Sequence, residues 1–100
     1  MVPKGYLERK LGEELKEYVK KLLDQGYKDI VVSFAEVPLI NSLGVSGIIE
    51  VFDLIDSSGG EIWFADANKE VETVLEVSGV LNMVPKIYTS DEARRTIISG

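Results

Sequence analysis

The sequence predicts a single α/β domain built on a small, mostly parallel β-sheet. Segments in which apolar residues recur at helical spacing alternate with short β-branched runs, and the connections between them are short. Strand–helix–strand units of this kind close through right-handed crossovers, which pair the strands in parallel. A chain of 100 residues with 45% apolar residues can form one hydrophobic core but not two. We therefore expect residues 1–100 to form one domain.

The first two elements are a helix and a buried strand. A helix is predicted over residues 9–23, and Gln25-Gly26 ends it. Residues 29–34 are a β-branched run with no internal charge, which is typical of a strand buried on both faces. The apolar residues that recur at helical spacing are Leu7, Leu11, Leu15, Tyr18, Val19 and Leu22.

A second helix and strand follow. The helix is predicted over residues 42–57, with Asn41 as its N-cap and Gly59-Gly60 as its end. The next strand covers residues 61–65, where three large apolar residues follow one another.

Two more helices and a short strand complete the prediction. A helix near residues 69–78 ends with Gly79 in the C-cap position. Residues 83–88 can supply a last strand, and Pro85 makes it an edge strand or a bent one. A final helix is predicted over residues 90–98, where a serine followed by two acidic residues supplies the cap. The domain thus has about four helices.

Composition excludes several classes of function. The absence of cysteine excludes disulfides and thiolate metal sites, and the absence of histidine removes the commonest general base and metal ligand. A net charge of −6 without a cluster of Lys and Arg argues against nucleic-acid binding. No apolar run approaches the roughly 20 residues that span a bilayer, and no signal peptide is visible. We expect a cytoplasmic protein with no cofactor, no metal and no direct membrane insertion.

The helix over residues 42–57 has a narrow polar stripe on an otherwise apolar surface. The stripe consists of Ser42, Ser46, Glu50, Asp53 and Ser57. The residues expected to border it are Leu43, Gly47 and Leu54 on one side and Val45 and Ile49 on the other. The residues expected to face the sheet are Gly44, Ile48, Val51, Phe52 and Ile55. Ser42 is therefore predicted to face solvent within an apolar rim, a plausible docking surface.

Two glycines near the start of this helix, Gly44 and Gly47, weaken it by roughly 1 kcal/mol each relative to alanine. Close approach of another backbone would explain them, and that backbone could be the neighbouring strand. Asn-Ser before an apolar helix is also common capping chemistry and, taken alone, indicates no function.

Several landmarks occur in a fixed order along the chain. They are the strand at 30–34, Asn41-Ser42-Leu43-Gly44-Val45, Gly59-Gly60, the strand at 62–65, the helix end at 74–80 and Ser90-Asp91-Glu92-Ala93. From Gly5 to Ile98 this layout resembles a STAS domain (sulphate transporter and anti-sigma-factor antagonist) of the bacterial anti-sigma-factor antagonist type, with the α/β fold called SpoIIAA-like. Residues 1–7 cover only the end of the family's usual N-terminal strands. The shortened strands would leave one sheet edge uncovered, which favours a homodimer or a strand exchange.

The resemblance implies a partner switch. In such proteins an anti-sigma factor that is also a serine kinase phosphorylates the serine that corresponds to Ser42, the phosphorylated form no longer binds the kinase, and a phosphatase restores binding. The residues expected to contact the partner are Asn41, Leu43, Gly44, Val45, Ser46, Gly47, Ile49, Glu50 and Leu54.

Three residues depart from the family pattern. Asn41 replaces the usual aspartate, Leu43 replaces a second Ser or Thr, and Ser33 stands where many members have an acidic residue. The first two favour an alternative function, a STAS adaptor that is not phosphorylated and binds constitutively within a transport or stress-signalling complex. An enzyme is the least favoured class, because carboxylates such as Asp53 and Asp56 are most simply a solvated helix face.

Overall fold

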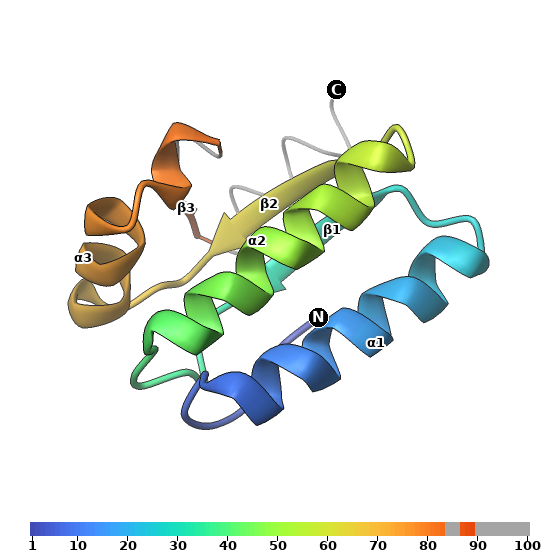
Figure 1. Cartoon of the computed structure of the whole chain (residues 1–100). Helices are drawn as coiled ribbons and strands as arrows, with labels where there is room; N and C mark the ends of the chain where they lie inside the picture. The colour runs from blue at the N-terminus through green and yellow to red at the C-terminus, as the bar shows by residue number, and fades with distance from the viewer. Residues whose placement is uncertain (84–86, 90–100) are drawn as a thin grey trace.

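The computed structural model describes residues 1–83 and 87–89 (Figure 1). The elements in chain order are α1 (Arg9–Asp24), β1 (Asp29–Ser33), α2 (Ser42–Ser57), β2 (Glu61–Ala65), α3 (Lys69–Val77), the 3₁₀ helix η1 (Val80–Asn82) and β3 (Ile87–Tyr88). The first five match the predicted elements closely. Of the predicted strand at 83–88, Ile87–Tyr88 is a strand, whereas Met83 is the C-cap of η1, so the prediction is wrong for that residue. The predicted helix at 90–98 lies outside the described residues.

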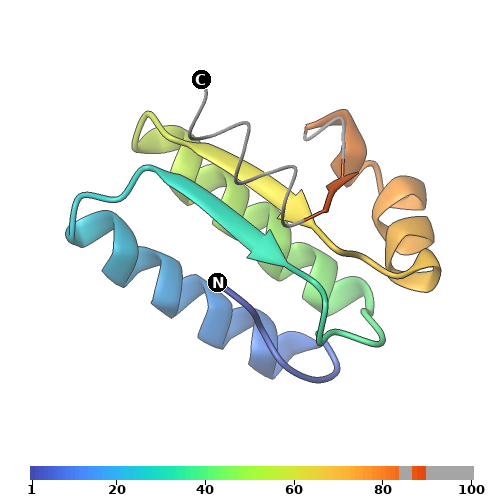
Figure 2. The ribbon, with the colours of Figure 1, turned by 180° about the vertical axis from the view of Figure 1, so that it is seen from behind.

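The sheet is parallel, as the strand–helix alternation predicts. Its order is β1-β2-β3. Ile30 lies opposite Ile62 and Val32 opposite Phe64, and Phe64 also pairs with Ile87 on the other side. Helices α1 and α2 lie on one face of the sheet, as the two opposite views show (Figures 1 and 2). Parallel strands joined by helices bring α2 and α3 to begin at the carboxyl edge of the sheet.

The edge of β1 is occupied by residues 1–7, contrary to the expected uncovered edge. The backbone N–H of Ser33 donates to the carbonyl of Met1 at 2.9 Å, and that of Leu7 donates to the carbonyl of Leu39 at 2.9 Å. Isolated parallel bridges continue this alignment beyond the end of β1. The argument for a homodimer that pairs through an uncovered edge of β1 is therefore no longer supported.

Both glycines near the start of α2 contact another backbone, as predicted, but the neighbour is not a strand. A Cβ on Gly44 would lie 2.0 Å from the carbonyl oxygen of Leu7, and a Cβ on Gly47 would lie 2.9 Å from the Cα of Gly12 in α1. Because neither contact leaves room for a side chain, these glycines allow α2 to pack closely on α1 and on the segment before it.

Candidate functional site

The start of α2 is held by the side chain of Asn41. Asn41 is extended, with φ −111° and ψ −179°, and its Oδ1 accepts a hydrogen bond from the backbone N–H of Gly44 at 2.9 Å. This is N-cap geometry, so the cap predicted at Asn41 is confirmed. Ser42 is the first residue of the helix, and its side chain is exposed.

The electrostatic surroundings of Ser42 favour negative charge. The first turn of α2 contains no acidic residue, and the N-terminus of a helix carries a partial positive charge from its free N–H groups. One turn further on, the hydroxyl of Ser46 donates to the carbonyl of Ser42 at 3.1 Å. Ser42 thus presents a hydroxyl to solvent where an added anion would be stabilised.

The apolar rim around Ser42 is narrower than the sequence predicts. Leu43 is 53% exposed, and Ile49 and Leu54 are partly buried. Gly44, Gly47 and Val45 are buried, and Val45 is only 7% exposed. Gly44 is covered by the segment before α1 and Gly47 by α1, whereas Val45 belongs to the hydrophobic core and also lines a groove toward α3. Partner contact by these three residues stays a prediction.

An open groove runs between the start of α2 and α3. Its volume is about 460 Å³. It is lined by Ile40, Asn41, Ser42, Val45, Thr73, Val74, Val77 and Ser78. Ser42 therefore belongs to the groove wall, and Val77, 82% exposed, forms part of the opposite wall. The core-facing side of α3 is made by Val71 and Leu75, so Val77 continues an apolar pattern beyond what the core needs.

The contribution of α3 to the groove is not predicted by the sequence analysis, which places all expected partner contacts on Asn41 and α2. The signal was present: in α3, Val74 and Val77 are three residues apart and share one face of the helix. The pair lies to one side of the stripe that Val71 and Leu75 bury. An apolar stripe wider than one core contact indicates a second neighbour or a free surface.

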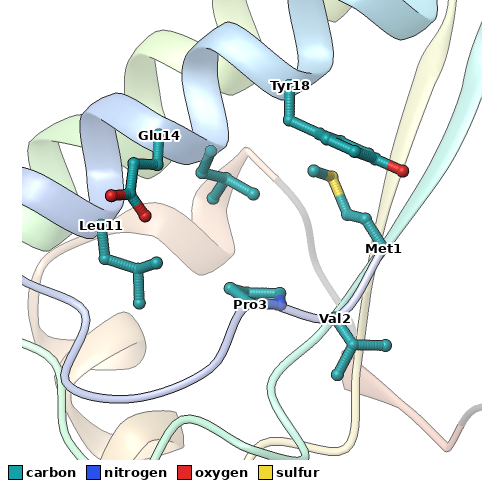
Figure 3. Close-up of a pocket in the computed structure, with 7 residues that line it drawn as sticks. Met1, Val2, Pro3, Leu11, Glu14 and Tyr18 are labelled. Atoms are coloured by element: carbon teal, nitrogen blue, oxygen red, sulfur yellow. The ribbon is translucent and has the colours of Figure 1, made fainter.

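A second hollow lies between residues 1–3 and α1 (Figure 3). Its volume is about 270 Å³. The lining residues are Met1, Val2, Pro3, Leu11, Glu14, Leu15 and Tyr18, none of which is a predicted site residue. The lining is mainly apolar with one carboxylate, which supplies no set of groups for catalysis.

Within residues 1–83 and 87–89, no cluster of His, Cys, Asp and Glu side chains could hold a metal ion. In the same residues, every helix is too short or too polar to cross a membrane.

Known proteins share this sequence pattern. The family model of the STAS domain matches residues 12–93, so this chain belongs to the STAS domain family. The anti-sigma F factor antagonist of Paenibacillus polymyxa is 32% identical over 62 residues. That alignment covers 62% of this chain and 52% of the relative, so the chain spans about half of the relative's length.

Solved structures share the fold. A crystal structure of a provisionally assigned anti-sigma factor antagonist from Thermotoga maritima has a TM-score of 0.82 and 29% identity, covering 95% of this chain and 84% of that one. An NMR structure of the same protein has a TM-score of 0.78 and 29% identity, with coverages of 94% and 79%. The structure of the anti-sigma factor antagonist SpoIIAA in its unphosphorylated form has a TM-score of 0.67 and 14% identity, covering 99% of this chain and 86% of that one. The predicted SpoIIAA-like fold is confirmed.

Proposed function

We propose that this chain is an anti-sigma factor antagonist that acts as a phosphorylatable partner switch. While Ser42 is unphosphorylated, the chain binds an anti-sigma factor that is also a serine kinase. The observation that carries the proposal is the exposed hydroxyl of Ser42 at the first position of an Asn-capped helix, next to the exposed side chain of Leu43. The descriptions of the relatives as anti-sigma factor antagonists support the choice of partner.

In the switching step the kinase transfers the γ-phosphoryl group of ATP to Ser42. The bond between the γ-phosphorus and the β,γ-bridging oxygen breaks, a bond from the Oγ of Ser42 to phosphorus forms, ADP leaves, and the hydroxyl proton passes to a base of the kinase. A phosphatase reverses the switch by hydrolysing the phosphoserine. This chain is the substrate of both reactions and not an enzyme, and the lack of histidine and cysteine in its sequence supports that role.

Phosphorylation would block binding through charge and desolvation. A phosphate adds about −1.5 to −2 charge at pH 7. The helix N-terminus can hold this charge in solvent, so the fold is expected to survive. A partner that covers the groove and Leu43 would have to remove water from the dianion, which costs several kcal/mol unless it supplies a counter-charge. We expect partner affinity to fall on the order of a hundredfold or more.

A kinase assay tests the proposal. The chain is incubated with ATP and the anti-sigma factor kinase that is its proposed partner, and its intact mass is measured. We expect a gain of one phosphoryl group in the wild type and in Ser46→Ala, and none in Ser42→Ala. Ser46 is the matched control because it is an exposed serine of the same helix, one turn away. Phosphate on another residue, or on none, contradicts the switch.

The docking surface is tested separately by binding. Leu43→Glu introduces a charge at an exposed apolar residue, so we expect partner binding to be lost and the circular dichroism spectrum to stay unchanged. Glu72→Gln, on an exposed part of α3 outside the groove, serves as a control that should bind normally. Ile49→Glu is less informative than the sequence suggests, because Ile49 packs against the core. Full binding by Leu43→Glu would contradict the proposed surface.

A second function, a constitutive STAS adaptor subunit of a transport or stress-signalling complex, is favoured by Asn41 and Leu43. These residues stand where the family pattern has an aspartate and a second hydroxyl. The adaptor hypothesis expects no phosphate on Ser42 with any kinase and equal partner affinity for the wild type and Ser42→Asp. The switch hypothesis expects the opposite result in both measurements.

A further inference from the structure

The loops that follow β1 and β2 are joined at the carboxyl edge of the sheet. The backbone N–H of Phe34 donates to the carbonyl of Ala65 at 2.8 Å, and the hydroxyl of Ser33 donates to Oδ2 of Asp66 at 3.0 Å. Both contacts lie where the strands end. Neither reaches the far parts of the two loops, where α2 and α3 begin.

The far parts of the loops are joined by the side chain of Asn68. Its Oδ1 accepts a hydrogen bond from the backbone N–H of Val71 at 2.8 Å, which caps α3. Its Nδ2 donates to the carbonyl of Pro38 at 3.2 Å, across 30 residues of sequence. One amide group therefore contacts the first turn of α3 and the loop that leads into α2.

The Pro38 loop is held from two sides. The next carbonyl along the chain, that of Leu39, accepts a hydrogen bond from the backbone N–H of Leu7 at 2.9 Å. Adjacent carbonyls of an extended segment point in opposite directions, so the segment lies between residues 1–7 on one side and Asn68 on the other. Removing the Asn68 contact would release the side that faces α3.

We propose that Asn68 is a positioning residue for partner binding. Its amide sets the distance between α3 and the loop that carries Leu39 and leads to Ser42, and so sets the shape of the groove between α2 and α3. This inference rests on the proposed function, because it assigns the groove to the partner. Asn68 lines no part of the groove and acts through Val77 on one wall and Ser42 on the other.

The side-chain chemistry of position 68 is restrictive. Serine and aspartate cap a helix about as well as asparagine does. Aspartate has no donor for the carbonyl of Pro38 when it is ionised, and serine is too short to cap α3 and reach that carbonyl together. Since the contact to Pro38 is exposed to solvent, its loss should leave the domain folded. The main effect should be a change in the position of α3.

Asn41 provides a matched control for the cap. Its Oδ1 accepts from Gly44 as that of Asn68 accepts from Val71. Among the hydrogen bonds of the described residues, none is donated by the Asn41 side chain. Asn41→Ser therefore changes a cap and one residue of the groove lining but removes no contact between the two loops, whereas Asn68→Ser and Asn68→Asp change a cap and also remove the contact to Pro38.

The first measurement is NMR on protein labelled at valine methyl groups, without any partner. Nuclear Overhauser effects among Val45, Val74 and Val77, which line the groove from both helices, report its shape. We expect Asn68→Asp and Asn68→Ser to weaken the effects between α2 and α3 by more than half, and Asn41→Ser to leave them unchanged. Equal effects in all four proteins overturn the proposal. Circular dichroism and thermal unfolding confirm that each variant is folded.

The second measurement is the kinetics of Ser42 phosphorylation by the anti-sigma factor kinase. Because Asn68 positions a docking surface and does not touch the reacting hydroxyl, we expect KM to rise about tenfold in both Asn68 variants, which corresponds to about 1.4 kcal/mol, with kcat unchanged. A fall in kcat with constant KM, or no change, overturns the assignment to partner binding. If the wild type takes no phosphate, the proposed switch fails, and the NMR comparison still decides whether Asn68 shapes the groove.

Discussion

Helices α2 and α3 begin with the same cap and differ in the turn that follows. In both, the Oδ1 of an asparagine, Asn41 or Asn68, accepts from the N–H three residues later. The first turn of α3 carries Glu70 and Glu72, whereas that of α2 carries no acidic residue. Carboxylates in a first turn neutralise the positive end of a helix. Of these two helices, α2 is therefore the one whose N-terminus has no first-turn carboxylate, and Ser42 is the residue placed there.

The third residue of each helix differs as well. In α2 it is Gly44, which lies against the backbone of Leu7. In α3 it is Val71, whose side chain is fully buried. The first turn of α2 is therefore positioned by a backbone contact, and that of α3 by a buried side chain together with the contact from Asn68 to Pro38. A contact between two backbones cannot be relieved by a change of side-chain rotamer. The start of α2 is therefore a rigid support for Ser42.

The largest expected effect comes from placing a methyl group in that backbone contact. In Gly44→Ala the Cβ would lie 2.0 Å from the carbonyl oxygen and 2.7 Å from the carbonyl carbon of Leu7. We expect the free energy of unfolding to fall by at least about 3 kcal/mol, measured by urea denaturation.

Gly12→Ala is the control for this substitution. Its Cβ would lie 3.5 Å from the Cα of Gly47, an ordinary contact. Alanine is also a better helix former than glycine by about 1 kcal/mol, so Gly12→Ala should be neutral or stabilising. A Gly44→Ala protein as stable as the wild type would show that α2 is free to shift against Leu7.

A smaller effect is expected at the equivalent residue of α3. Val71→Ala removes two methyl groups from a fully buried side chain, which should lower the free energy of unfolding by about 2 kcal/mol. Val77→Ala, in the same helix but 82% exposed, should change it by less than about 0.5 kcal/mol. Equal losses for the two variants would mean that α3 does not pack as described.

The bounds and cap of α2 could be predicted because they depend on local sequence. Helical spacing gives the direction of each side chain around the axis, and Asn41 at the N-cap satisfies the first-turn N–H groups whatever the fold. The exposure of Ser42 follows from the same spacing. Periodicity does not say which element covers each side of a helix, so it does not predict that α1 lies against Gly47 or that Val45 is buried.

The pairing of residues 1–7 with β1 could not be predicted from local pattern. That segment contains Pro3 and Gly5 and has no alternation of apolar and polar residues, so it lacks a strand signature. Its hydrogen bonds depend on how α1 returns the chain to the sheet. The contact between Asn68 and Pro38 joins two loops that are 30 residues apart, and asparagine before a helix indicates only a cap.

The smallest expected effect compares charge at the two helix starts. Ser42→Asp places a carboxylate at the uncompensated end of α2, and Glu70→Gln removes one from the first turn of α3. We expect the first to raise and the second to lower the free energy of unfolding, each by about 0.5 kcal/mol at low salt and less at high salt.

Glu76→Gln serves as the control because Glu76 lies in the last turn of α3, where a carboxylate is disfavoured. Removal of the Glu76 charge should be neutral or slightly stabilising. Because Glu70→Gln and Glu76→Gln change the net charge equally, a difference between them reports the effect of the helix end. Ser42→Asp must also weaken partner binding while it keeps or increases stability. A Ser42→Asp protein that is destabilised would show that the N–H groups of α2 do not hold an anion, and a phosphate on Ser42 would then disturb the fold as well as the docking surface.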